Sequence, residues 1–153
     1  MTKTPRTWFV VADGEHARVL AHQTDRGFEE ARRLDSAAAH QRARDLGANR
    51  PGRAFESTGG ARHAVAPRTD PQRRAKTDFA QILAEEIVRA RQQGAFDRLA
   101  LVAPPPILAA IKEHLDAECG RRLDGELAKD LTKLPEEELR RRLAALGGRH
   151  EGA

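Results

Sequence analysis

The first third of the chain alternates short apolar runs with turn signals, and this pattern predicts a β-meander. Residues 7–12 (TWFVVA) are β-branched and aromatic, which is typical of a central strand covered on both faces. Asp13-Gly14 is a turn signal, and partial alternation over residues 16–22 predicts the second strand of a hairpin. Residues 28–34 are more charged and predict a third strand at the edge of the sheet.

The clearest helix of the sequence follows residue 70. Asp70 is suited to the N-cap, Pro71 to the first helical position, and Gly94 to the stop. Between them, apolar side chains recur at helical spacing and form one stripe. Its members are Phe79, Ile82, Leu83, Ile87 and Ala90. The stripe predicts that this helix covers one face of the sheet.

Strands and helices continue to alternate after that helix. Residues 96–103 predict a buried strand, and the prolines at 104–106 open a second helix. Residues 121–129 predict a further strand, in which Asp124-Gly125 causes a bulge or a break. The cysteine at position 119 then falls where the second helix ends, so we interpret it as a packed thiol rather than a nucleophile.

The C-terminal part predicts one last helix, which begins at Pro135 and ends near Gly147. We expect a single domain over residues 1–147 and a frayed tail over 148–153. The expected fold is α/β with an α+β tendency: a mixed sheet with an N-terminal meander followed by α-β-α-β-α.

The composition points to the cytoplasm and away from a membrane. Cys119 is the one cysteine among 153 residues, so no internal disulfide is available. The apolar run at residues 8–12 is too short for a signal-peptide core or a membrane span. We therefore expect a cytoplasmic protein without a membrane partner, whose oligomeric state the sequence leaves open.

The excess positive charge lies in one segment of the chain. Residues 40–76 carry nine basic side chains against three acidic ones, a net charge of +6, whereas the whole chain has +4. Residues 36–68 lack an apolar period and predict a long basic loop, shortened by a helical turn near 37–44. Arginine forks and glycine-freed amides suit phosphates, with a solvated charged loop as the alternative. The candidate nucleic-acid-binding residues are Arg50, Arg53, Arg62, His63, Arg68, Arg73 and Arg74.

Several motifs stand in an order that carries a family resemblance. They are WFVVADG at 8–14, HARVL at 16–20, RPGRAFES at 50–57, His63, PRTDP at 67–71, FDRLALVAPP at 96–105 and KDLT at 129–132. Together they resemble the host attachment protein family over nearly the whole chain. The resemblance implies a fold like the middle domain of eukaryotic and archaeal class I peptide-release factors, with a basic loop where those proteins present a Gly-Gly-Gln tip. Here Ala61 follows Gly59-Gly60, so release activity is not expected.

A second group of candidate residues could form a motif site. Its members are Asp13, Gly14, Phe55, Glu56, Ser57 and Asp130. Asp13 ends a strand, as the first carboxylate of a two-metal nuclease does, but a turn-forming role explains it better. His16 and His22 lie about 20 Å apart along an extended strand, too far to share one metal ion. We therefore expect no metal, no cofactor and no catalytic residue.

Three functions remain open at this point. The leading hypothesis is a non-enzymatic RNA- or ribosome-associated module that docks through the basic loop. One alternative is a protein-interaction domain in the regulation of surface attachment. The other is a hydrolase with a site near Asp13 and the loop at residues 53–63.

Overall fold

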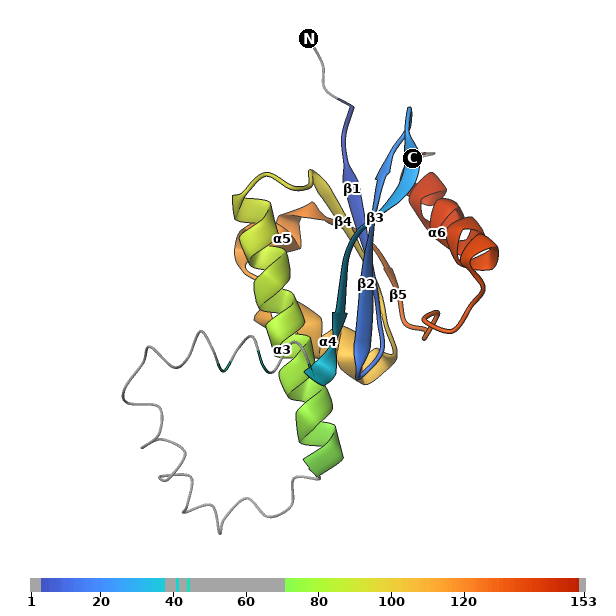
Figure 1. Cartoon of the computed structure of the whole chain (residues 1–153). Coiled ribbons are helices and arrows are strands. Elements are labelled where there is room, and N and C mark those ends of the chain that lie inside the picture. Colours follow the sequence, from blue (N-terminus) through green and yellow to red (C-terminus); the bar gives the residue numbers. More distant parts are fainter. Residues whose placement is uncertain (1–3, 38–40, 42–43, 45–70, 152–153) are drawn as a thin grey trace.

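The computed structural model describes residues 4–37, 41, 44 and 71–151, and within them the chain forms one five-stranded mixed sheet (Figure 1). The strands are β1 (Thr7–Ala12), β2 (His16–Gln23), β3 (Gly27–Asp35), β4 (Arg98–Val102) and β5 (Leu123–Leu127), in the order β3-β2-β1-β4-β5. This confirms the predicted meander and α/β class. The strands around residues 8–12 and 99–103 are buried, as expected, and they are neighbours, because β1 pairs in parallel with β4.

Helices cover both faces of the sheet. One face packs against α3 (Pro71–Gln92), α4 (Pro105–His114) and α5 (Ala117–Arg122), and the other against α6 (Glu136–Glu151) (Figure 1). Along β1 the side chains alternate between the two layers. Trp8 and Val10 join the core under α3, whereas Phe9 and Val11 join the core under α6. This double burial explains why β1 is an uninterrupted apolar run.

The structure corrects the expected course of the chain between β4 and β5. We expected one helix there, but α4 ends at His114, Leu115 is extended, and Asp116 caps the separate short helix α5. Cys119 therefore lies near the start of a helix and not at the end of one. Because α5 runs to Arg122, β5 starts two residues later than expected.

The C-terminal helix is also longer than the sequence pattern predicts. We expected its end near Gly147, yet α6 continues through Gly147-Gly148 to Glu151. The expected loop at residues 36–68 lies largely outside the described residues. At its start, Ser36, Ala37, Gln41 and Arg44 are helical, which agrees with the predicted turn near 37–44.

Each outer strand of the sheet contains one residue that has no partner on the neighbouring strand. In β3, Ala31 is extra, because Val19 pairs with Arg32 and Leu20 with Glu30. In β5, Asp124 is the extra residue, which confirms the predicted irregularity at Asp124-Gly125. Such bulges interrupt the regular edge that a second sheet would need for pairing.

The strand directions bring most of the connections to one end of the sheet. β2 runs antiparallel to β1 and β3, and β4 and β5 run parallel to β1. Four strands therefore finish at the same end, which we call the carboxyl end of the sheet. The β1–β2 turn, the segment after β3, the start of α4 and the segment after β5 all lie there. In open α/β sheets this is where ligands usually bind.

Candidate functional site

Two adjoining clefts open at the carboxyl end of the sheet. The first, which we call the lysine cleft, has a volume of about 510 Å³ and lies among the β1–β2 turn, α3, the start of α4 and the segment after β5. Its polar lining includes Asp13, Arg73, Lys76, Asp130 and Lys133. The second, the β3 cleft, has a volume of about 630 Å³ and lies between the same turn, the end of β3 and α3.

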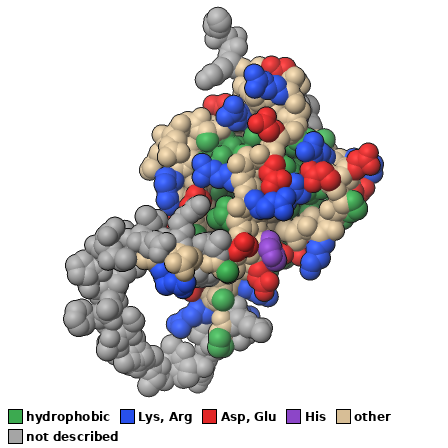
Figure 2. Space-filling model, in the orientation of Figure 1, with side chains coloured by type: hydrophobic (Ala, Val, Ile, Leu, Met, Phe, Trp, Pro, Cys, Tyr) green, Lys and Arg blue, Asp and Glu red, His purple; other side chains and the backbone are tan. Residues whose placement is uncertain are grey.

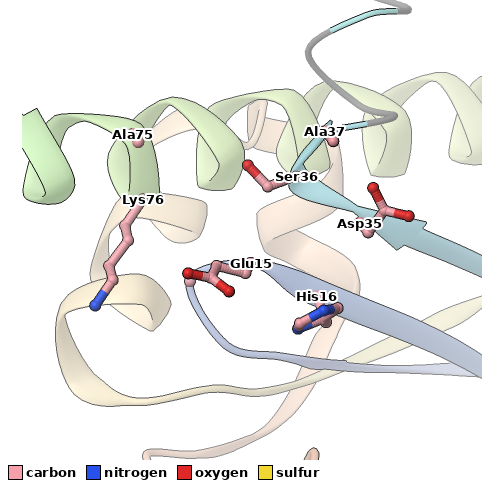
Figure 3. A pocket seen from close by; sticks show the side chains of 8 residues that line it. Glu15, His16, Asp35, Ser36, Ala37, Ala75 and Lys76 are labelled. Atoms are coloured by element: carbon pink, nitrogen blue, oxygen red, sulfur yellow. The ribbon is translucent and has the colours of Figure 1, made fainter.

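Lys76 lies across the β1–β2 turn and lines both clefts. It reaches from α3 toward the turn that carries Glu15 and His16, opposite Asp35 and Ser36 at the end of β3 (Figure 3). The side chain lies so close to Gly14 that a Cβ there would be 2.6 Å from Lys76 Cγ. The lysine can therefore occupy this place because residue 14 has no side chain.

Asp13 holds the β1–β2 turn with both carboxylate oxygens. Its Oδ1 accepts hydrogen bonds from the backbone amides of Glu15 at 2.7 Å and His16 at 2.6 Å, and its Oδ2 accepts one from the Thr132 hydroxyl at 3.1 Å. Burial raises the pKa of Asp13, but these hydrogen bonds outweigh it, and the pKa lies below its usual value. The turn-forming role that the sequence favoured is confirmed.

Thr132 connects Asp130 to Asp13, because its hydroxyl contacts both carboxylates. Asp130 Oδ1 accepts a hydrogen bond from the Thr132 amide at 2.9 Å and also contacts the Thr132 hydroxyl. That hydroxyl therefore lies between two carboxylates that are far apart in the sequence. Asp13, Gly14 and Asp130, the described members of the predicted motif site, meet at the lysine cleft. Its other members, Phe55, Glu56 and Ser57, lie outside the described residues.

Three exposed cations surround the lysine cleft. Arg73 and Lys76 come from the first turns of α3, and Lys133 comes from the segment after β5. Within the described part of the chain, no side chain forms an ion pair or hydrogen bond with their charged groups. The cleft thus combines free positive charge with a carboxylate, Asp130, that is also exposed.

Several charged residues elsewhere on the surface are held in ion pairs. Arg18 contacts Glu30 at 3.2 Å and Glu136 at 2.9 Å, which joins β2, β3 and the start of α6. Figure 2 shows basic and acidic side chains lying side by side over this part of the molecule. The exposed Arg141 likewise pairs with Glu138 at 2.7 Å. Unlike these paired arginines, the three cations of the lysine cleft have no ion-pair partner among the described residues.

Only part of the predicted phosphate-binding set can be placed. Arg73 and Arg74 are exposed on α3, and Arg73 lines the lysine cleft. The remaining members lie outside the described residues; they are Arg50, Arg53, Arg62, His63 and Arg68. Sequence reasoning did not single out Lys76, Thr132 or Lys133. Thr132 ends the KDLT motif and Lys133 follows it, so that motif was the available signal.

Two kinds of reactive group can be checked among the described residues, a metal cluster and the cysteine thiol. No group of three or more His, Cys, Asp or Glu side chains among them is arranged to hold a metal ion. Cys119 is fully buried, and burial together with the Asp116 carboxylate raises the pKa of its thiol to about 11. The thiol is therefore protonated at neutral pH, in agreement with the interpretation of a packed cysteine.

The comparisons with known proteins identify a family. The model of the family described as "protein required for attachment to host cells" matches residues 8–143. Comparison with curated proteins gives no match. None of the helices in the described ranges has both the length and the apolar character of a membrane span. Because the match covers nearly all of the strands and helices that build the sheet and the lysine cleft, the chain belongs to the family of proteins required for attachment to host cells.

Proposed function

We propose that this protein is a non-catalytic RNA-binding module that holds RNA phosphates at the lysine cleft and along the adjoining basic segment, residues 40–76. The observation that carries the proposal is that Arg73, Lys76 and Lys133 line one cleft and have no ion-pair partner in the part of the chain that the structure describes. Ammonium and guanidinium groups without protein partners attract phosphates and release the counterions condensed on a nucleic acid.

The position of the cleft adds a second argument. Segment 40–76, with its net charge of +6, ends in the first turns of α3, and these turns supply Arg73 and Lys76 to the cleft. A polyanion bound at the cleft therefore contacts the C-terminal end of the most basic segment of the sequence. The ribosome offers the same phosphate chemistry, and the resemblance to release-factor middle domains makes it the RNA partner that we expect.

The hydrolase alternative receives no support from Asp13. Both of its oxygens accept hydrogen bonds within the protein, and its lowered pKa makes it a weak base at neutral pH. The remainder of that alternative site, at residues 53–63, lies outside the described residues. We therefore assign Asp13 to shaping the cleft rather than to chemistry.

The test is the salt dependence of RNA binding. We expect Arg73→Ala, Lys76→Ala and Lys133→Ala, combined in one variant, to weaken binding of a single-stranded RNA of mixed sequence. If each side chain neutralises one phosphate, the slope of log affinity against log salt should become shallower by about 2, since each contact on a single strand contributes roughly 0.7. Fluorescence anisotropy at several salt concentrations measures this slope.

A matched variant removes the same charge elsewhere. Arg33, Arg121 and Arg141 have exposed side chains, at 66%, 69% and 70%, and each pairs with a glutamate three residues away. Their combined replacement by Ala should leave the slope nearly unchanged, because these arginines already have protein partners. Equal effects of the two triple variants would show that RNA binding depends on the total charge of the protein and not on the cleft, which would contradict the proposal. Undetectable RNA binding at low salt would refute the proposal.

A further inference from the structure

The lysine cleft contains a carboxylate that a purely phosphate-binding site would not need. Asp130 lines the cleft together with Lys76 and Lys133, and it is exposed. Its Oδ1 accepts a hydrogen bond from the Thr132 amide and contacts the Thr132 hydroxyl, while its Oδ2 has no hydrogen-bond partner among the described residues. As far as the described residues go, the cleft therefore presents an acceptor oxygen without a partner, on a carboxylate that Thr132 orients.

The other carboxylates of the cleft do not offer the same arrangement. Both oxygens of Asp13 accept hydrogen bonds within the protein. Glu15 is exposed, and no contact within the described part of the chain holds its carboxylate in one place. Asp130 is thus the oriented acceptor of this site.

A negative charge among phosphate-binding cations repels a phosphate that comes close to it. The arrangement favours a ligand that carries both phosphates and hydroxyl groups, because a carboxylate accepts a strong hydrogen bond from a hydroxyl. RNA has a 2′-hydroxyl on every ribose, next to its phosphates, and DNA lacks this donor. Lys76, Lys133 and Asp130 line the same cleft, and an RNA strand likewise carries phosphates and hydroxyl groups close together.

We propose that the lysine cleft selects RNA over DNA, with Asp130 Oδ2 accepting a hydrogen bond from a ribose 2′-hydroxyl while Lys76 and Lys133 hold neighbouring phosphates. This inference rests on the proposed function, since it requires that nucleic acid binds at the cleft. Thr132 is a positioning residue, because it orients Asp130 without touching the ligand.

The test compares three oligonucleotides of one sequence: RNA, DNA and 2′-O-methyl RNA, which keeps the phosphates but loses the hydroxyl donor. We expect the wild-type protein to bind RNA roughly tenfold more tightly than the other two, the ratio that corresponds to about 1.4 kcal/mol. Asp130→Ala should weaken RNA binding and leave DNA binding equal or tighter, because the variant removes both an acceptor and a repulsive charge.

A matched variant separates hydrogen bonding from charge. Glu113 is an exposed acid near the end of α4, whereas the start of that helix lines the cleft. Glu113→Ala removes the same charge and should change RNA and DNA affinity alike, and only slightly. Thr132→Val frees Asp130 from one contact, so it should lower the RNA preference less than Asp130→Ala does. Thermal unfolding verifies that every variant is folded.

The outcomes distinguish this inference from the proposed function. If neither RNA nor DNA binds, the proposed function fails and the selectivity fails with it. If both bind with equal affinity, the proposed function stands and the selectivity is refuted. If Asp130→Ala tightens RNA and DNA binding equally, Asp130 acts through charge alone, and the assignment of a hydroxyl acceptor is wrong.

Discussion

At the scale of single residues, the close approach of Lys76 and Gly14 fixes the geometry of the clefts. Gly14 has no positive φ angle to explain its presence, since the positive-φ glycines of the described chain are Gly27 and Gly94. The reason is spatial: a Cβ at residue 14 would be 2.6 Å from Cγ and 2.7 Å from Cδ of Lys76. The absence of a side chain at Gly14 thus lets Lys76 of α3 pack against the β1–β2 turn.

Gly14→Ala should therefore act on binding through Lys76. The lysine has to move aside, but it is exposed and flexible, so we expect the free energy of unfolding to change by less than about 1 kcal/mol. The salt slope of RNA binding should become shallower by up to about 0.7, the contribution of one phosphate contact. Anisotropy titrations and urea unfolding measure the two effects.

A double-mutant cycle checks this route. In a Lys76→Ala background, adding Gly14→Ala should have no further effect on the slope, because the side chain that it displaces is already absent. A full additional loss in the double variant would show that Gly14 acts by another route, such as its own backbone.

At this scale the sequence predicts some roles well and others hardly at all. The Asp13-Gly14 pair indicates a turn through its residue types alone. The hydrogen bonds that Asp13 accepts from the amides of Glu15 and His16 confirm this turn. The contact of Asp13 with Thr132 joins residues 119 positions apart. No local pattern encodes such a pair, because the fold alone brings the two segments together.

At the scale of elements, α3 is fastened to the outer strand β3 by a partly buried ion pair. Arg32 Nη1 lies 3.1 Å from Glu86 Oε1, and the guanidinium lies 5.5 Å from the centre of the Trp8 ring. Glu86 is only 7% exposed, and it is the one charged residue among the buried residues of the described chain. Its carboxylate therefore depends on neighbouring cations.

Arg32→Ala should destabilise the fold more than the loss of an exposed ion pair does. The variant leaves the Glu86 carboxylate with Arg89, at 3.9 Å, among its remaining neighbours. Because Arg32 is 37% exposed, we expect a cost of about 1–2 kcal/mol, below the value for a fully buried pair. Arg33→Ala on the same strand, whose partner Glu30 is more exposed, should cost less than about 1 kcal/mol.

Urea unfolding of the two variants and of Glu86→Ala measures this difference. The double variant Arg32→Ala/Glu86→Ala should lose less stability than the sum of its single changes, since the buried carboxylate that lost a cation is also removed. Equal costs for Arg32→Ala and Arg33→Ala would argue that Glu86 is well solvated after all.

Element order was predictable wherever periodicity and end signals agree. The stripe of α3 starts after Pro71 and stops before Gly94, whose φ of +77° fits a glycine stop. The break between α4 and α5 was missed because Leu115 and Asp116 continue a helical pattern of apolar and polar residues. The cap that Asp116 forms with the Cys119 amide, at 2.8 Å, depends on Leu115 being extended.

At the scale of the whole molecule, the directions of the strands determine where the candidate site lies. The connections after β1, β3, β4 and β5 meet at the carboxyl end of the sheet, and the basic segment joins α3 there. The sequence predicts the strands and the charge of that segment, but it does not predict that Lys133 lies beside Arg73 and Lys76. That juxtaposition follows from the strand order, which a single sequence does not specify.

We expect the lysine cleft and the basic segment to bind one RNA strand together. Arg53, Arg62 and Arg68 belong to the segment that carries nine basic and three acidic side chains. If these arginines contact further phosphates of the same strand, their combined replacement by Ala should make the salt slope shallower by about 2. Added to the cleft triple variant, the change should be roughly additive, because separate phosphates are involved.

Oligonucleotide length provides the control for this prediction. For a strand just long enough to fill the lysine cleft, the cleft variant should change the salt slope of binding and the segment variant should not. For a longer strand, both variants should change it. We expect thermal unfolding of the segment variant to match that of the wild type, because charged side chains seldom belong to a protein core. An unchanged slope with the long strand would limit the RNA-binding surface to the cleft and remove residues 53–68 from it.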